Sequence, residues 1–234
     1  RMLMLTVLRR EEKYLLTLKE ALQCADRFEK TLAPDDFSKD GAYQIRSLYF
    51  DTVDDRDFHD KLTEQNCRQK IRLRIYSPGD SQVKLELKQK ENVYQKKRSL
   101  LISREDALSL IEGRYSVLLN YEDPFAGEMF VLLTEGCYRP RTIIEYSRRA
   151  FMAKENNIRL TFDSNIRALE GDCRLFFQAL PLYPVLPGGQ VIFEVKYNQF
   201  LLSYIMDIIR CVDRRSVSAS KYCLGRSLSY FSLS

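Results

Sequence analysis

The sequence predicts an α+β fold with a largely antiparallel β-sheet flanked by helices. Two strand patterns, at 67–76 and 82–90, flank a Ser-Pro-Gly-Asp turn and predict a β-hairpin. Strands and helices do not alternate with Gly-rich turns, which argues against Rossmann and P-loop folds. Lys and Arg recur at every second position of several predicted strands. We expect one domain over residues 1–234.

The first third of the chain reads as two strands and two helices. Residues 6–16 predict a strand that leads into a helix. Thr17 and Glu20 then have the spacing of a capping box, which predicts that a helix begins here and ends near Pro34. The remaining patterns predict a strand over 43–50 and a short helix over 54–61.

The rest of the chain also predicts both strands and helices. A third strand over 93–102 follows the hairpin, and Ser103 is placed to cap a helix that Gly113 stops. The later patterns predict a helix over 122–134, strands over 141–150, 158–163 and 190–197, and helices over 200–212 and 220–230.

Charged residues are sorted by position along the strands. Alternate residues of a strand point to opposite faces, so positions of one parity share a face. The charged positions are Arg68, Lys70, Arg72, Arg74; Lys84, Glu86, Lys88, Lys90; Lys96, Arg98; Arg159, Asp163; Glu194, Lys196; and Arg9, Glu11, Lys13. A solvated face normally mixes charge signs, and like charges on paired strands destabilise a sheet. If helices cover the apolar face, the cationic face becomes the inner surface of a curved or closed sheet, which favours a polyanion as the ligand.

Composition excludes several kinds of site. The one His, His59, rules out a multi-His metal site, so a metal would be held by carboxylates, phosphates and water, which favours Mg²⁺ or Mn²⁺. The six Cys lack metal-binding spacing and predict reduced thiols in a cytoplasmic protein. No apolar run is long enough to span a membrane. Aromatic residues do not interleave with the cations, which argues against a nucleic-acid partner.

Eight short motifs, in order along nearly the whole chain, resemble those of VTC (vacuolar transporter chaperone) domains in the triphosphate tunnel metalloenzyme superfamily. They are RREEKY (9–14), SLYFDT (47–52), KIRLRIY (70–76), LELK (85–88), YSRRAF (146–151), IRLTFD (158–163), EVK (194–196) and SKYCLG (220–225). The resemblance implies that the antiparallel sheet closes into a β-barrel, flanked by helices, which forms a tunnel. Its basic lumen would bind a triphosphate or a growing polyphosphate.

The resemblance also implies a reaction and a set of site residues. The reaction is transfer of the γ-phosphoryl group of ATP to polyphosphate, assisted by Mn²⁺ or Mg²⁺, with pyrophosphate or polyphosphate as the other partner. The catalytic residues implied are Lys13, Arg72, Arg74, Lys88, Tyr146, Arg148 and Arg159. Lys96, Lys196 and Lys221 are the further substrate-binding residues, and Glu194 and Glu11 the metal ligands.

Two other functions stay open. A tunnel-type triphosphatase would transfer the same phosphoryl group to water. A binding module that has lost turnover would keep the cations but lack a metal carboxylate, whereas Glu194 is present. The superfamily opens with two Glu where this chain has Arg9 and Glu11, which leaves a second metal ligand open. The role of Glu86, counter-charge or metal ligand, and the oligomeric state are also open.

Overall fold

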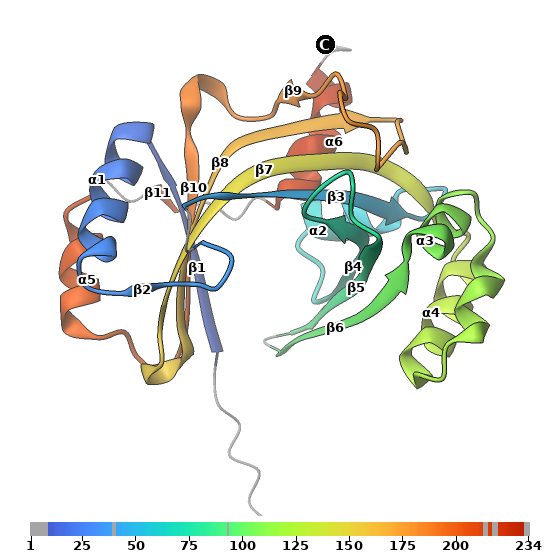
Figure 1. Cartoon of the computed structure of the whole chain (residues 1–234), viewed down its shortest axis with the longest axis horizontal. Helices are drawn as coiled ribbons and strands as arrows, with labels where there is room; N and C mark the ends of the chain where they lie inside the picture. Colours follow the sequence, from blue (N-terminus) through green and yellow to red (C-terminus); the bar gives the residue numbers. More distant parts are fainter. Residues whose placement is uncertain (1–8, 39–40, 93, 213–214, 217–219, 232–234) are drawn as a thin grey trace, which may run out of the picture. The chain divides into compact units, whose positions relative to one another are not determined.

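The computed structural model (Figure 1) describes residues 9–38, 41–92, 94–212, 215–216 and 220–231. The chain divides into two compact units. Unit 1 comprises Arg1–Gln44, Tyr146–Ile166 and Leu186–Ala219, and unit 2 comprises Ile45–Glu145, Arg167–Val185 and Ser220–Ser234. A single domain over 1–234 stays a prediction. Residues 6–8 and Val93, which we expected in strands, lie outside the described residues.

The strands form one antiparallel sheet, as predicted. Within the described residues they are β1 (Arg9–Leu16), β2 (Ala33–Pro34), β3 (Tyr43–Asp51), β4 (Cys67–Ile75), β5 (Gln82–Glu91), β6 (Tyr94–Ser103), β7 (Arg139–Ala153), β8 (Ile158–Glu170), β9 (Tyr183–Pro184), β10 (Val191–Asn198) and β11 (Arg215–Ser216). Their order is β11-β1-β10-β8-β7-β3-β4-β5-β6, with β2 beside β7 and β9 beside β8. In this order no pairing of described residues joins β11 to β6, so backbone hydrogen bonds do not establish a closed barrel.

The helices follow the predicted ones closely. They are α1 (Leu18–Glu29), α2 (Arg56–Leu62), α3 (Arg104–Ile111), α4 (Pro124–Glu135), α5 (Ser203–Arg210) and α6 (Lys221–Phe231), with 3₁₀ turns η1 (Tyr115–Asn120), η2 (Glu155–Asn157) and η3 (Pro187–Gly189). The capping box of Thr17 and Glu20 is present at the start of α1. No helix in the described part of the chain is both long and apolar enough to cross a lipid bilayer.

In unit 1, helices cover the apolar face of the strands. Figure 1 shows α1 and α5 side by side. Phe28 of α1 is fully buried and its ring lies 6.3 Å from that of Phe162 and 6.2 Å from that of Phe193. Phe162 and Phe193 stack on each other at 4.5 Å, from β8 and β10. Burying such aromatic side chains stabilises the unit by several kcal/mol in total, about 1.5–3 kcal/mol each. Polar side chains lie on the opposite face of these strands.

In unit 2, the same arrangement is repeated with other elements. Leu73 of β4, Leu85 of β5 and Ile102 of β6 are buried in one cluster with residues of α3, η1 and α4. Arg98 of β6 lies at the edge of this apolar side, with its guanidinium 4.9 Å from the centre of the Phe125 ring. The apolar positions of the hairpin therefore face helices, as the alternation predicts.

A buried carboxylate, Asp51, fixes the start of α2. Its two oxygens accept hydrogen bonds from the backbone N–H groups of Asp57 (2.9 Å) and Phe58 (3.0 Å). The Tyr222 hydroxyl, from α6, donates to the same carboxylate at 2.5 Å. The Asp57 carboxylate accepts from the Tyr138 hydroxyl at 2.9 Å. Burial, and then the nearby Asp51 charge, raises the pKa of Asp57 to about 7.

Candidate functional site

Carboxylates and ammonium groups alternate on the polar face of unit 1. In the pairing of β1 with β10, Lys13 lies opposite Glu194 and Glu11 opposite Lys196. Lys13 Nζ is 3.0 Å from Glu11 Oε1 and 3.8 Å from Glu194 Oε1. Lys196 Nζ is 3.0 Å from Glu194 Oε1 and 4.0 Å from Glu11 Oε2. The structure thus brings four of the predicted site residues into one cluster, which we call the Glu194 cluster.

Arg148 of β7 is held on the same face by a buried partner. Asp163 of β8 accepts hydrogen bonds from Arg148 Nε (2.7 Å) and Nη2 (2.8 Å). Burial works against the charge of Arg148, but Asp163, Tyr146 and Glu194 outweigh it and raise the pKa of Arg148 above its ordinary value. The guanidinium carbon also lies 5.3 Å from the centre of the Tyr146 ring. Two predicted site residues, Arg148 and Tyr146, therefore lie together, in electrostatic contact with the Glu194 cluster.

Arg159 of β8 has a carboxylate partner that the sequence did not reveal. Its Nη2 donates to Asp35 Oδ2 at 2.8 Å and to the Tyr43 hydroxyl at 3.3 Å. Asp35 is itself buried, and its backbone N–H donates to the carbonyl of Ala150 on β7. Arg159 lies opposite Lys196 in the register of β8 and β10 and so shares the polar face of unit 1.

Two carboxylates of unit 1 form the best available donor set for a divalent metal. Across the described residues, no three His, Cys, Asp or Glu side chains gather closely enough to hold a metal alone. Glu11 and Glu194 lie on adjacent strands of one face, and Mg²⁺ usually takes its other ligands from substrate phosphates and water. Thr161 lies directly opposite Glu194, and its buried hydroxyl oxygen has no hydrogen-bond partner in the structure. These oxygen donors fit Mg²⁺ or Mn²⁺ bound together with a phosphate ligand.

The polar face of unit 2 gathers three cations around one carboxylate. Glu86 of β5 is buried, and its Oε2 lies 2.6 Å from Arg72 Nε and 3.9 Å from Arg74 Nη1. Its Oε1 lies 2.6 Å from Lys97 Nζ. Arg72 also donates to the Tyr49 hydroxyl at 2.8 Å. We call Glu86, Arg72, Arg74 and Lys97 the Glu86 cluster.

The Glu86 cluster carries a net positive charge. Burial alone raises the pKa of Glu86, but Arg72, Arg74 and Lys97 outweigh burial and lower that pKa to about 2. The carboxylate is therefore ionised at neutral pH, and three cations face one anion. The close partners of Glu86 that the structure gives are three cations, which is the arrangement expected of a counter-charge.

The structure corrects the face assigned to Lys96. In the pairing of β5 with β6, Lys97 lies opposite Lys88, whereas Lys96 lies opposite Gln89. The expectation that Lys96 shares a face with Lys88 is wrong, because the register across the β5–β6 turn pairs positions of opposite parity. Lys97, not Lys96, shares the face of Lys88. The sequence of β6 alone could not have shown that Lys97 lies opposite Lys88, because the turn between β5 and β6 sets the register.

The remaining predicted residues are placed on the same unit but not in the Glu86 cluster. Lys88 lies on the polar face, opposite Lys70 on β4. Lys221 is the first residue of α6 and lies outside any strand. Of the residues that sequence reasoning did not assign, Asp35, Lys97 and Asp163 each bind a cation or a carboxylate of these faces.

Comparison with solved structures supports the fold. The Hippeastrum protein HpAC1, a provisionally assigned adenylyl cyclase described as having a dominant triphosphatase activity, aligns with a TM-score of 0.56 at 12% identity, over 93% of this chain and 94% of that chain. A Bacillus halodurans protein, provisionally assigned as an adenylate cyclase, aligns with a TM-score of 0.48 at 13% identity, over 97% of this chain and 90% of that chain. At such identities only the fold of HpAC1 is informative.

Comparison with sequences identifies the family. A search of curated protein sequences found no match. The family description of the VTC domain matches residues 8–230, which is nearly the whole chain. This chain belongs to the VTC domain family.

Proposed function

We propose that the protein is a polyphosphate polymerase, which transfers the γ-phosphoryl group of ATP to the end of a growing polyphosphate chain. The observation that carries the proposal is the Glu86 cluster, where three cations converge on one ionised carboxylate and leave a net positive charge for a phosphate chain. Membership of the VTC family supports it. Closure of the sheet into a tunnel with a basic lumen is part of the same proposal.

On unit 2, the cations bind phosphate oxygens. Arg72 and Arg74 supply planar pairs of N–H donors, and Lys97 and Lys88 supply compact charge. Glu86 holds Arg72 and Lys97 at 2.6 Å each, so these groups are oriented before a ligand binds. Orientation in advance lowers the entropy lost on binding. Lys221, the first residue of α6, stays a predicted substrate-binding residue. The misplaced Lys96 is assigned no contact with the reacting phosphates.

On unit 1, the polar face carries both charge signs. Lys13, Lys196, Arg148 and Arg159 bind phosphate oxygens, and Tyr146 lies against Arg148. Glu11 and Glu194 would hold Mn²⁺ or Mg²⁺, which neutralises phosphate charge when bound. Phosphoryl transfer depends mostly on such positioning and neutralisation.

The transfer step needs no base from the protein. A terminal oxygen of the acceptor phosphate forms a bond to the γ-phosphorus of ATP, the bond from that phosphorus to the β–γ bridging oxygen breaks, and ADP leaves with the electron pair. The acceptor oxygen is already ionised at neutral pH, so no proton has to be removed. The lone His59 is therefore not required.

The proposal is tested with purified protein, ATP and Mn²⁺, and product separated on a urea gel. The wild-type protein is expected to form a ladder of polyphosphate, which Glu194→Gln and Arg72→Ala each reduce by a factor of a hundred or more, on the order expected for lost electrostatic stabilisation. Glu112→Gln, a change in an exposed ion pair with Arg114, serves as the control. Unchanged synthesis in a variant that combines Glu194→Gln with Arg72→Ala would exclude the site. Orthophosphate as the main product would favour the triphosphatase alternative.

A further inference from the structure

Tyr222 of α6 is held at both ends of its side chain. It is buried, and its hydroxyl donates to Asp51 Oδ2 at 2.5 Å. Burial, and then the Asp51 charge, raises the pKa of Tyr222, so the hydroxyl keeps its proton and remains a donor. The ring of Tyr222 stacks on that of Tyr49 of β3, with the ring centres 5.1 Å apart and the planes 20° from parallel. The stacking restrains the ring of Tyr49 from the side of α6.

Tyr49 contacts Arg72 of the Glu86 cluster. The two residues lie opposite each other in the pairing of β3 with β4. Arg72 Nη1 donates to the Tyr49 hydroxyl at 2.8 Å, and the guanidinium carbon lies 5.6 Å from the centre of the Tyr49 ring. Arg72 Nε donates to Glu86 Oε2 at 2.6 Å. Two partners therefore orient the guanidinium, and one of them, Tyr49, is in contact with α6.

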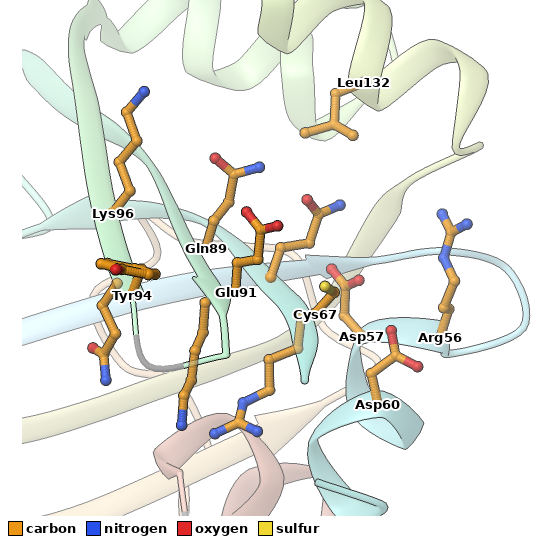
Figure 2. Close-up of a pocket in the computed structure, with 13 residues that line it drawn as sticks. Arg56, Asp57, Asp60, Cys67, Gln89, Glu91, Tyr94, Lys96 and Leu132 are labelled. Atoms are coloured by element: carbon orange, nitrogen blue, oxygen red, sulfur yellow. The ribbon is translucent and has the colours of Figure 1, made fainter. Parts of the chain in front are cut away.

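Asp51 is a fixed anchor for Tyr222 because it also holds α2. The Asp51 carboxylate accepts from the backbone N–H groups of Asp57 and Phe58, as described above. Figure 2 shows Asp57 and Asp60 of α2, which line a pocket of about 590 Å³. If the Tyr222 hydroxyl is removed, the Asp51 carboxylate keeps its hydrogen bonds from the backbone of α2.

Other contacts hold α6 in place without Tyr222. Gly225 lies so close to β7 that a Cβ atom there would overlap the side chain of Ile144. Arg226 donates to both carboxylate oxygens of Asp55, at 2.8 and 2.7 Å. A change at Tyr222 is therefore expected to alter the contact with Tyr49 while α6 stays in position.

We propose that Tyr222 is a positioning residue, which orients Arg72 through Tyr49 and so raises the affinity of the Glu86 cluster for a triphosphate. The inference rests on the proposed function and adds to it a contribution from α6. Tyr222 itself touches no phosphate; it lowers the entropy that Arg72 loses when a ligand binds. By linkage, a triphosphate bound to Arg72 stabilises the packed position of α6 in turn.

The test is a double-mutant cycle on the affinity for tripolyphosphate, measured by calorimetry. Tyr222→Leu removes the stacked ring and is expected to weaken binding about fivefold, on the order of the contribution of an aromatic pair. Tyr49→Phe keeps the ring but removes the acceptor of Arg72, and we expect a similar loss. The variant with both changes is expected to bind as Tyr49→Phe does, because no Tyr49 hydroxyl is left for Tyr222 to orient.

Two variants of α6 serve as controls. Tyr222→Phe keeps the stacked ring and is expected to bind tripolyphosphate within twofold of the wild type. Ser227→Ala removes a hydroxyl that donates to the backbone carbonyl of Cys223 in the same helix, and it is expected to leave the affinity unchanged.

Two results of the cycle would overturn the role of Tyr222. One is wild-type affinity in Tyr222→Leu, and the other is a pair of losses that add in the double variant, which would indicate a general effect on the fold. If Tyr222→Leu does not fold, hydrogen exchange of the wild-type protein replaces the cycle. Tripolyphosphate is then expected to slow the exchange of the α6 amides, and unchanged exchange there would refute the coupling.

The cycle measures binding and requires no turnover, so its outcome is separate from that of the polymerase assay. A protein that shows the coupling but makes no polymer would refute the proposed function alone. A polymerase in which the two losses add would refute the role of Tyr222 alone.

Discussion

The fully buried carboxylate of Asp163 accepts two hydrogen bonds from the guanidinium of Arg148, at 2.7 and 2.8 Å. The pair leaves Arg148 in one orientation on the polar face of unit 1. Asp163→Asn keeps the shape but removes the charge, so we expect a loss of about 3 kcal/mol in the free energy of unfolding, typical of a broken buried pair. Urea denaturation measures this loss in the free energy of unfolding.

The control for Asp163 is Asp26→Asn, which breaks an exposed ion pair with Lys30. Exposed pairs contribute little, so this variant is expected to unfold like the wild type. Equal stability of Asp163→Asn and Asp26→Asn would show that the Arg148 pair is not important for the fold. Polymer synthesis by Asp163→Asn is also expected to fall, because Arg148 is no longer oriented.

Glu86→Gln is expected to make the protein depend on an added anion. The change leaves Arg72, Arg74 and Lys97 without their common counter-charge, and we expect a loss of about 3 kcal/mol in stability. Tripolyphosphate replaces that charge, so it should raise the melting temperature of the variant more than that of the wild type. A thermal scan with and without tripolyphosphate measures this. An equal shift in both proteins would mean that the anion does not bind at the Glu86 cluster.

Two neighbouring lysines are expected to differ. Lys97→Gln should weaken the binding of tripolyphosphate about tenfold, because Lys97 lies in the Glu86 cluster. Lys96→Gln should leave that affinity unchanged, because Lys96 lies on the other face of β6. Calorimetric titration of both variants provides the comparison. The reverse order would place Lys96 in the phosphate site and contradict the register.

Asp57 is expected to make stability depend on pH. Its pKa is raised from 3.8 to about 7, so between these values the unfolded chain releases a proton that the folded protein keeps. Stability therefore falls as the pH rises from about 4 to about 7. Asp57→Asn removes this titration, and its stability relative to the wild type should rise across that window by up to a few kcal/mol, since a pKa difference of one corresponds to about 1.4 kcal/mol.

The pH dependence is measured by urea denaturation at several pH values. Asp207→Asn, at an exposed site on α5, is the control and should run parallel to the wild type. If the curve for Asp57→Asn also runs parallel, then Asp57 does not retain its proton in the folded protein.

Local patterns predicted much of the fold. The capping box of Thr17 and Glu20 and the start of α3 at Ser103 depend on residues a few positions apart, and both are found as expected. Alternation also placed the apolar positions of β4, β5, β8 and β10 against helices. Each of these features depends only on neighbours in the chain.

Other features depend on partners far apart in the sequence. The pairing of Lys97 with Lys88 is set by the turn that joins β5 and β6, in which Asn92 has a positive φ of 55°. Asp35 meets Arg159 across 124 positions of the chain, and alternation carries no information about such a pair. Closure of the sheet into a barrel also depends on long-range pairing, between the end strands β11 and β6, and it stays a prediction.

The most direct test of the central claim follows the γ-phosphate of ATP. Wild-type protein is incubated with Mn²⁺ and ATP labelled at the γ-position, and the label is separated into polymer and orthophosphate. A polymerase is expected to place most of the label in polyphosphate, with the label in polymer lost in Glu194→Gln. Label recovered only as orthophosphate, with no polymer at any time, would contradict the account.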